Sequence, residues 1–338
     1  MISIKRRVVL ATLAASMAVA LPAHAQTTVV KISHQFPGGT LDKGDFRDRL
    51  VRMFAAEVEK RSKGSLKFEI YPGSSLMKTN AQFSAMRKGA LDMSLVPLSY
   101  AGGEVPETNI GLMPGLVTSY EQGYAWKAAP VGQELTKILA DKGVVLVSWI
   151  WQAGGMASRG KPIVEPEDAK GMKIRGGSRE MDLILKEAGA AVVTLPSNEI
   201  YAGMQTGAMD AALTSSTSLI SFRLEEVSKA LTTGRGKSYW FMLEPLMMSK
   251  ATFDRLTKEQ QALILAVGAD MEKFALTAAK ADDNEVAAVF AKAGSKTADL
   301  SEATVKRWQD IARRTAWKDF AAKNANTAKL LQLAEQVK

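Results

Sequence analysis

The 338-residue chain contains no cysteine and only two histidines, His24 and His34. Without cysteine it can form neither disulfides nor thiolate metal sites, and it can carry neither a cysteine nucleophile nor a lipid on an N-terminal cysteine. Two histidines are also too few for a histidine-rich zinc site. The sequence therefore predicts no metal site and no cofactor.

Motifs that would indicate an enzyme are missing as well. No Gly-x-Ser-x-Gly elbow is present to place a nucleophilic serine near His34. No glycine-rich phosphate loop ends in Lys-Ser or Lys-Thr, and the Arg-Gly-Gly-Ser sequence at 175–178 has the wrong spacing for a dinucleotide. Catalysis by carboxylates alone stays open, because any Asp or Glu pair could converge in the fold. We expect a protein that is not an enzyme.

The first 25 residues have the three parts of a secretory signal peptide. Residues 5–7 are positively charged, 8–21 form an apolar run, and Ala-His-Ala at 23–25 is a small-x-small cleavage site. The apolar run is shorter than the ~20 residues that a membrane-spanning helix needs. We therefore expect 1–25 to be removed on export, leaving a periplasmic protein that is not inserted in the membrane.

The charge distribution is that of a mildly basic surface. The formal net charge of +9 falls to +6 when the three cationic residues at 5–7 leave with the signal peptide. Lys and Arg are mixed with Asp and Glu along predicted helices, without basic runs and interleaved aromatics, so nucleic acid is not an expected partner. A modest positive field favours the capture of small anions.

Strand-like and helix-like segments alternate along the chain, which favours an α/β fold. After export, about 310 residues exceed the usual size of a single hydrophobic core, so two lobes are expected. We place lobe I at 26–151 with about 237–280. Lobe II is placed at 152–236 with about 281–338, which includes the C-terminal helices.

Some segments carry specific predictions of secondary structure. Residues 144–151 are apolar except for Ser148 and predict one long strand, after which 151–155 crosses into lobe II. Residues 237–241 and 246–249 predict strands that return to lobe I. From Thr257 onward, the pattern predicts helix with few turns.

The most informative stretch for function begins at Gly171. The sequence Gly-Met-Lys-Ile-Arg at 171–175 predicts a short buried strand with Arg175 at its C-terminal end. In open α/β sheets this end of a strand faces the ligand crevice. A guanidinium there matches a carboxylate with two parallel hydrogen bonds. This local pattern alone does not distinguish a ligand-binding Arg175 from an arginine that faces solvent at the end of a strand.

Several segments, in order, resemble the DctP-type solute-binding subunits of TRAP transporters, the tripartite ATP-independent periplasmic systems. The segments lie at 31–34, 64–73, 89–93 and 171–175, and at Glu199, Ile200 and Tyr201 with Gln205, Thr206, Gly207 and Asp210. The resemblance extends over essentially the whole chain after residue 25.

This resemblance implies a two-lobed α/β fold of the type II periplasmic binding-protein kind, with mixed sheets and a long helix spanning both lobes. It also implies that Arg175 binds a ligand carboxylate and that the lobes close over the ligand. The implied membrane partners are a small and a large permease subunit, driven by an ion gradient.

Departures from the family pattern narrow the ligand. Many sialic-acid and dicarboxylate members have a second arginine near the crossover, where this chain has Gln-Ala-Gly-Gly-Met at 152–156. We therefore predict a monocarboxylate, either an aromatic acid or a small hydroxy or keto acid. The predicted ligand contacts are Arg175, Thr214, Ser215, Ser216, Trp151, Trp240, His34, Asn80 and Asn198. Core packing stays the alternative for the aromatic residues, as does a structural role for His34.

Other functional classes also stay open. The chain could be the receptor of another transporter class or a partner that presents a ligand to a membrane sensor. A periplasmic lyase or hydrolase that works with carboxylates is a further alternative. The helical stretch after Thr257 favours the TRAP class, whose members carry a long helix across both lobes.

Overall fold

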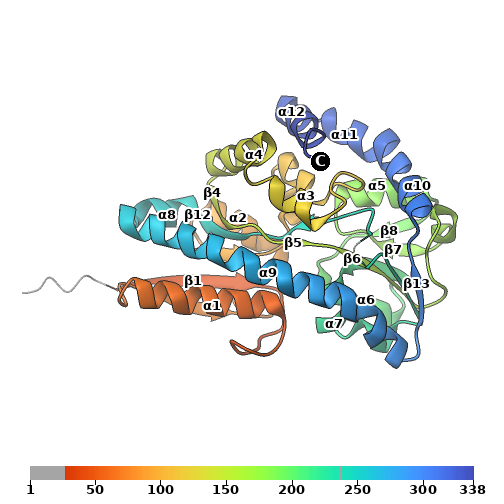
Figure 1. Ribbon diagram of the computed structural model, residues 1–338, viewed down its shortest axis with the longest axis horizontal. Helices are drawn as coiled ribbons and strands as arrows, with labels where there is room; N and C mark the ends of the chain where they lie inside the picture. The colour runs from red at the N-terminus through yellow and green to blue at the C-terminus, as the bar shows by residue number, and fades with distance from the viewer. Residues whose placement is uncertain (1–26, 236) are drawn as a thin grey trace, which may run out of the picture.

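The computed structural model describes residues 27–235 and 237–338, so the predicted signal peptide lies outside the described residues. Figure 1 shows two sheets side by side along the long axis, with helices packed around them. We call the part built on the first sheet lobe I and the part built on the second sheet lobe II. No helix of the described part of the chain is both long and apolar enough to cross a membrane.

Lobe I contains a five-stranded sheet in the order β2-β1-β3-β12-β4. β1 pairs in parallel with β2 and β3, whereas β12 runs antiparallel to β3 and β4, so the sheet is mixed. Val30 and Ile32 are fully buried and Lys31 between them is exposed, the alternation expected of a strand with one face on the core. The strands are β1 (Thr28–His34), β2 (Leu66–Tyr71), β3 (Met93–Leu95), β4 (Val144–Ser148) and β12 (Leu246–Ser249).

Lobe II contains a six-stranded sheet in the order β13-β10-β6-β9-β7-β8. β7 is parallel to β8 and β9, and β6 is antiparallel to β9 and β10, so this sheet is also mixed. The strands are β6 (Gly154–Ser158), β7 (Lys173–Arg175), β8 (Ala191–Val193), β9 (Ala211–Ser215), β10 (Ala230–Thr233) and β13 (Lys296–Asp299).

A two-stranded pairing of β5 (Trp151–Gln152) with β11 (Met242–Leu243) connects the lobes. The single strand predicted over 144–151 is therefore wrong, because β4 ends at Ser148, before the chain leaves one sheet for the other. The strand predicted over 237–241 is also wrong in position, since β11 begins at Met242, one residue after the predicted strand ends.

The helices surround both sheets. The first five are α1 (Phe46–Arg61), α2 (Gln82–Arg87), α3 (Tyr120–Ala125), α4 (Pro130–Asp141) and α5 (Arg179–Glu187). Those that follow are α6 (Ile200–Thr206), α7 (Ser216–Ser221), α8 (Lys250–Arg255), α9 (Lys258–Lys292), α10 (Glu302–Ala312), α11 (Lys318–Ala321) and α12 (Ala325–Ala334).

Shorter helical turns link these elements. The 3₁₀ turns are η1 (Thr79–Ala81), η2 (Leu98–Ala101), η3 (Pro106–Leu112), η4 (Pro166–Ala169), η5 (Ser197–Glu199) and η6 (Leu224–Val227). A π-helical turn, η7 (Arg313–Trp317), joins α10 to α11.

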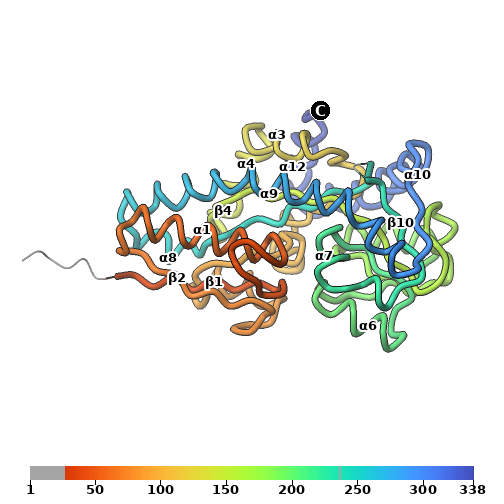
Figure 2. Tube along the Cα trace, turned by 60° about the horizontal axis from the view of Figure 1, so that its bottom comes forward, coloured from red at the N-terminus to blue at the C-terminus, as the bar shows by residue number. Residues whose placement is uncertain are grey.

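The 35-residue helix α9 runs along both lobes (Figures 1 and 2). It begins at a capping box, in which Thr257 and Gln260 each bond the other's backbone N–H. It packs against α1 in lobe I and α7 in lobe II. Gly268 allows α9 to approach β4, because a methyl group there would lie 2.2 Å from the carbonyl oxygen of Val147. The predicted two-lobed α/β fold with a helix across both lobes is confirmed.

Three strands of lobe II, β6, β10 and β13, escaped prediction. Gly154 and Gly155 indicated a crossover, yet they belong to β6, a central strand of this sheet. Glycine is required there because a Cβ would lie 2.1 Å from Thr214 O at the first position and 2.2 Å from Thr232 O at the second. β13 interrupts the predicted C-terminal helices and extends the sheet beside β10. The exact lobe boundaries stay a prediction, because α10 packs on α5 while α12 packs on α4.

Candidate functional site

Arg175 is the last residue of β7, and its side chain is buried where lobe II faces lobe I. Its Nε donates to the carbonyl oxygen of Leu195 at 3.0 Å, and Nη1 donates to that of Leu213 at 2.8 Å. Nη2 donates to the hydroxyl of Tyr100, from lobe I, at 2.8 Å. A guanidinium has five N–H groups, so two N–H groups remain for a ligand beyond these bonds.

The glycines after Arg175 make room for its guanidinium. Gly177 has a φ of +94°, and a methyl group at this position would lie 2.7 Å from Nη1 of Arg175. A methyl group at Gly176 would lie 2.4 Å from Oδ1 of Asp182. The Arg-Gly-Gly-Ser sequence therefore wraps a backbone turn closely around the guanidinium, a position where only glycine fits.

A small cavity lies against Arg175. It has room for the centre of a water-sized sphere over about 10 Å³, which is the space of about one water molecule. Residues of lobe I, lobe II and the connecting segment enclose it: Pro97, Tyr100, Leu112, Arg175, Gly177, Ser197, Leu213, Thr214, Trp240 and Met242. The lobes are thus closed over Arg175, and an organic ligand could reach it only if they open.

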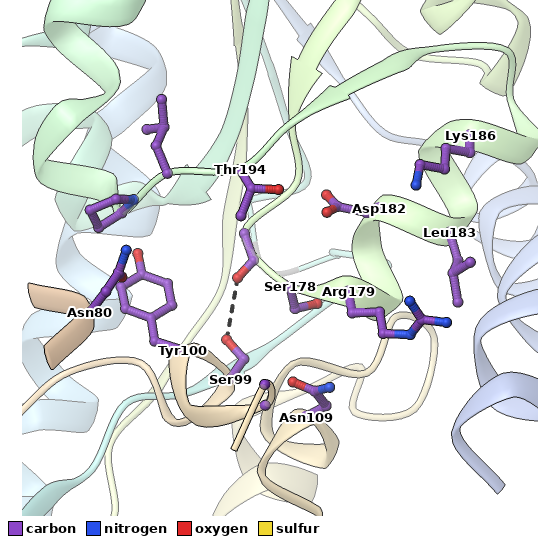
Figure 3. Close-up of a pocket in the computed structure, with 15 residues that line it drawn as sticks. Asn80, Ser99, Tyr100, Asn109, Ser178, Arg179, Asp182, Leu183, Lys186 and Thr194 are labelled. Carbon is purple, nitrogen blue, oxygen red and sulfur yellow. Dashed lines mark hydrogen bonds between the residues drawn. The ribbon is translucent and has the colours of Figure 1, made fainter. Parts of the chain in front are cut away.

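A larger cavity of about 470 Å³ lies on the other side of Tyr100 (Figure 3). Tyr100 and Gly177 line both cavities, so the tyrosine stands between them. Figure 3 shows Asn80 and Tyr100 on one side of the larger cavity, with Asp182 and Lys186 on the other. Ser99 of lobe I donates to the carbonyl oxygen of Gly177 at 3.4 Å across this space.

Two carboxyl groups beside the larger cavity, Glu180 (buried) and Asp182 (partly buried), hold their protons more strongly than usual. Burial raises the pKa of Glu180 to about 7, and the hydrogen bond from Asn109 at 3.0 Å opposes this only in part. Burial likewise raises the pKa of Asp182 to about 6, against the attraction of Arg175. Near neutral pH these groups carry less negative charge than ordinary carboxylates, which reduces the repulsion of an approaching anion.

Several predicted contacts lie together around Arg175. Thr214 and Trp240 line its small cavity, and Asn80 lines the larger one. Asn198 accepts a hydrogen bond from Thr79 of lobe I at 3.2 Å, so it lies at the contact between lobes.

Four other predicted contacts are placed elsewhere. Ser215 caps α7, Ser216 donates to Asp283 at 2.5 Å, and Nε2 of His34 lies 3.1 Å from Asp48. Trp151 packs edge to face on Trp126, with the ring centres 5.2 Å apart. None of the four lines either cavity described above. For His34 and Trp151, these contacts favour a structural role over contact with a ligand.

Sequence reasoning missed Tyr100, although a signal for it exists. Tyr100 lies in η2, shortly after β3 ends at Leu95, and β3 runs parallel to β1. Side chains that follow the C-terminal ends of parallel strands tend to face the crevice. Applying to lobe I the argument that identified Arg175 would have identified Tyr100.

Sequence reasoning also missed Arg47, which is fully buried in α1. Its Nη1 donates to Glu244 at 3.1 Å and to Ser218 of lobe II at 3.0 Å, and Nη2 donates to Asp45 at 2.6 Å. Its position three and seven residues before Leu50 and Phe54 puts it on the apolar face of the helix. A charge on that face is the signal that could have drawn attention to it.

Arg47 is paired with two carboxyl groups, those of Asp45 and Glu244. Burial, opposed by the attraction of Arg47, raises the pKa of Glu244 to about 7. Across the described residues, no group of three or more His, Asp or Glu side chains could hold a metal ion.

Known proteins are similar to this chain in sequence and in fold. A family model described as bacterial extracellular solute-binding protein, family 7 (DctP), matches residues 40–324. A solute-binding protein from Albidiferax ferrireducens is 77% identical over 314 residues, which covers 93% of each chain.

Solved structures extend this similarity. A TRAP periplasmic solute-binding protein from Rhodoferax ferrireducens, with bound malonate, has 78% sequence identity and a TM-score of 0.90 over 91% of this chain and 98% of that one. A Bordetella pertussis extracytoplasmic solute receptor binding pyroglutamic acid has 23% identity and a TM-score of 0.81 over 92% of this chain and 100% of that one. At that identity, the likeness concerns the fold alone.

Proposed function

Because this chain belongs to family 7 of the bacterial extracellular solute-binding proteins, the DctP family, we propose that it captures a small organic acid on Arg175. It is a solute-binding protein and not an enzyme. In this proposal the protein works in the periplasm, its lobes close over the ligand, and it delivers the ligand to the small and large permease subunits of a TRAP transporter.

The position of Arg175 carries the proposal. Two carbonyl oxygens of its own lobe, on Leu195 and Leu213, hold the guanidinium in place before a ligand arrives. A donor that is already oriented loses little entropy on binding, and its attraction to a carboxylate is stronger in a cavity that excludes water. The charge of Arg175 and its remaining N–H groups match a carboxylate.

The cavity around Arg175 supports a small ligand. Pro97, Leu112, Trp240 and Met242 supply apolar walls, and Thr214 supplies a hydroxyl. Of the predicted monocarboxylates, a hydroxy or keto acid of few carbons fits this narrow space better than an aromatic acid.

A short dicarboxylate is the second candidate ligand, because the Rhodoferax relative holds malonate. Its second carboxylate would have to bind through neutral donors such as Thr214. Arg47, the other buried arginine near this region, is already paired with Asp45 and Glu244.

Isothermal calorimetry on the exported chain tests the site, with lactate, pyruvate, malonate and benzoate as probes. Arg175→Ala should weaken binding of the best probe by about 100-fold or more, because the positive charge and the paired N–H donors are both lost. Arg175→Lys should weaken binding by about tenfold, since lysine keeps the positive charge but lacks the planar pair of N–H donors. Arg159→Ala removes an exposed arginine of the same lobe and is the matched control. Unchanged affinity in Arg175→Ala would refute the proposed site.

Delivery requires a separate test. Uptake of the radiolabelled acid into vesicles that carry the cognate permease subunits should require both this protein and an ion gradient. Uptake that depends on ATP instead would contradict the assignment to a TRAP system.

A further inference from the structure

Tyr100 belongs to lobe I, yet its hydroxyl lies among groups of lobe II. The hydroxyl oxygen accepts from Nη2 of Arg175 at 2.8 Å and from the backbone N–H of Ser197 at 2.9 Å. A tyrosine hydroxyl has about two acceptor positions and one hydrogen to donate. The two bonds fill both acceptor positions, so the hydrogen must be directed to a third group.

The cavity beside Arg175 is where that third group can lie. Tyr100 lines this cavity together with Arg175 and Thr214. A carboxylate that accepts from the guanidinium would bring an oxygen close to the Tyr100 hydroxyl, since Arg175 and Tyr100 are already in direct contact. We propose that Tyr100 donates its hydroxyl hydrogen to the ligand carboxylate and is the specificity-determining contact from lobe I. The inference deepens the proposed function and rests on it.

The two donors also make the Tyr100 hydroxyl a better donor. An oxygen that accepts from a guanidinium and from a backbone N–H is depleted of electron density, which strengthens the bond its own hydrogen makes. A carboxylate is the acceptor that gains most from such a donor, because the bond is then charge-assisted. A carboxamide of the same shape would gain less, so Tyr100 favours acids over their amides.

The lobe from which each group comes determines when it acts. Arg175 and Thr214 belong to lobe II and can take up the ligand while the lobes are open. Tyr100 follows β3 of lobe I and reaches the ligand only on closure. Its hydrogen bond therefore belongs to the closed complex and slows the release of the ligand.

Stopped-flow fluorescence separates these steps, because Trp240 lines the same cavity and can report binding. The probe is whichever of lactate, pyruvate and malonate binds the wild-type protein best. Tyr100→Phe, which removes one oxygen atom, should raise the dissociation rate by about tenfold and leave the association rate within about twofold. The variant should also lose part of the preference for the acid over its amide.

Tyr201→Phe is the matched control, because its hydroxyl donates to Glu226 on the exposed side of lobe II. Both of its rates should equal those of the wild type. A thermal melt of each variant without ligand confirms that the fold is retained.

Three results would overturn the inference. Equal rates in Tyr100→Phe would mean that the hydroxyl does not contact the ligand. Tighter binding would mean that the hydroxyl competes with the ligand for Arg175. A slower association with an unchanged dissociation rate would mean that Tyr100 only orients Arg175 in the free protein. Normal binding by Arg175→Ala would instead refute the proposed function, as would binding of none of the acids.

Discussion

Nη1 of Arg47 lies 3.0 Å from the hydroxyl oxygen of Ser218, and this bond joins α1 of lobe I to α7 of lobe II. Both side chains are buried, and the centre of the Phe36 ring lies 3.6 Å from the guanidinium carbon of Arg47. Opening of the lobes would remove an acceptor from a buried cation, which costs free energy. The bond therefore favours closure whether or not a ligand is present.

Removing two of the three serine hydroxyls that accept from Arg47 should shift the lobes toward the open state, with only the bond to Ser215, at 3.4 Å, left between Arg47 and lobe II. Ser218 and Ser221 accept from its two terminal nitrogens at 3.0 and 3.5 Å, so the Ser218→Ala/Ser221→Ala double variant loses both bonds. The charge pairs of Arg47 within lobe I stay intact. We expect the dissociation constant for ligand to rise about three- to tenfold, because less of the protein is closed.

The chain has no cysteine, so spin labels can be placed at two introduced sites without interference. Lys67 in lobe I and Gln205 in lobe II are exposed and suit Lys67→Cys and Gln205→Cys. Electron paramagnetic resonance should show a longer interlobe distance in the double serine variant. Ser228→Ala removes a hydroxyl that bonds only Leu224 within lobe II. The interlobe distance in this control variant should match that in the wild type. A double variant with an unchanged distance would refute this role for Arg47.

Arg175 could be placed from the sequence because its position depends on local pattern. A short apolar strand ending in arginine is visible within five residues, and the family resemblance adds the role. Tyr100 is 75 residues away from Arg175, and Ser218 is 171 residues away from Arg47. Local periodicity carries no information about such pairings, so the contacts between lobes could not be derived from it.

Ser215, which ends β9, and Ser216, which follows it, illustrate the same limit. Their hydroxyls suggested ligand donors, but Ser215 lies near Arg47 and Ser216 bonds Asp283 of α9. Which partner a hydroxyl takes depends on the helix that packs over it, and that helix is far away in the chain, α1 for Ser215 and α9 for Ser216. The fold was more predictable, because strand and helix alternation is a property of short segments.

Gly177 should be essential for ligand affinity, and Gly171 should not. Both have positive φ, at +94° and +76°, so alanine at either position costs about 1–2 kcal/mol of folding stability. Only at Gly177 would the added methyl group meet the Arg175 guanidinium, whereas nothing lies within 4 Å at Gly171. By calorimetry, Gly177→Ala should bind ligand about tenfold more weakly. Equal losses of affinity in both variants would show that backbone strain, not the contact with Arg175, is responsible.

The two tryptophans predicted to contact the ligand should behave differently. Trp240 lines the cavity at Arg175, so Trp240→Phe should weaken binding about fivefold by removing part of the apolar wall. Trp151 packs on Trp126 at the connection between lobes, and Trp151→Phe should lower the melting temperature without changing affinity. Calorimetry and thermal melts on both variants check this. A loss of affinity in Trp151→Phe alone would restore the prediction made from the sequence.

Stability should fall as the pH rises from about 4.5 to 7, because of buried carboxyl groups such as Glu180. Its pKa is about 7 in the folded protein against a usual value of 4.5. Between these values the folded state keeps a proton that the unfolded state has lost, so increasing pH favours unfolding across that window. Glu180→Gln removes the ionisation and keeps an oxygen to accept from Asn109. Its melting temperature should exceed that of the wild type by roughly 2–4 °C at pH 8 and equal it at pH 4.5.

Glu259→Gln provides the comparison for Glu180→Gln. Glu259 is exposed in the first turn of α9, where backbone and Thr257 hydrogen bonds lower its pKa. It is therefore ionised in both folded and unfolded states from pH 5.5 to 8, and its removal should leave the pH dependence unchanged. Glu244 and Asp182 also have raised pKa values. Glu180→Gln should therefore reduce the slope of melting temperature against pH without abolishing it. An unchanged slope of melting temperature against pH in Glu180→Gln would contradict this prediction. It would mean that Glu180 is already ionised in the folded protein, with its charge compensated by neighbouring groups.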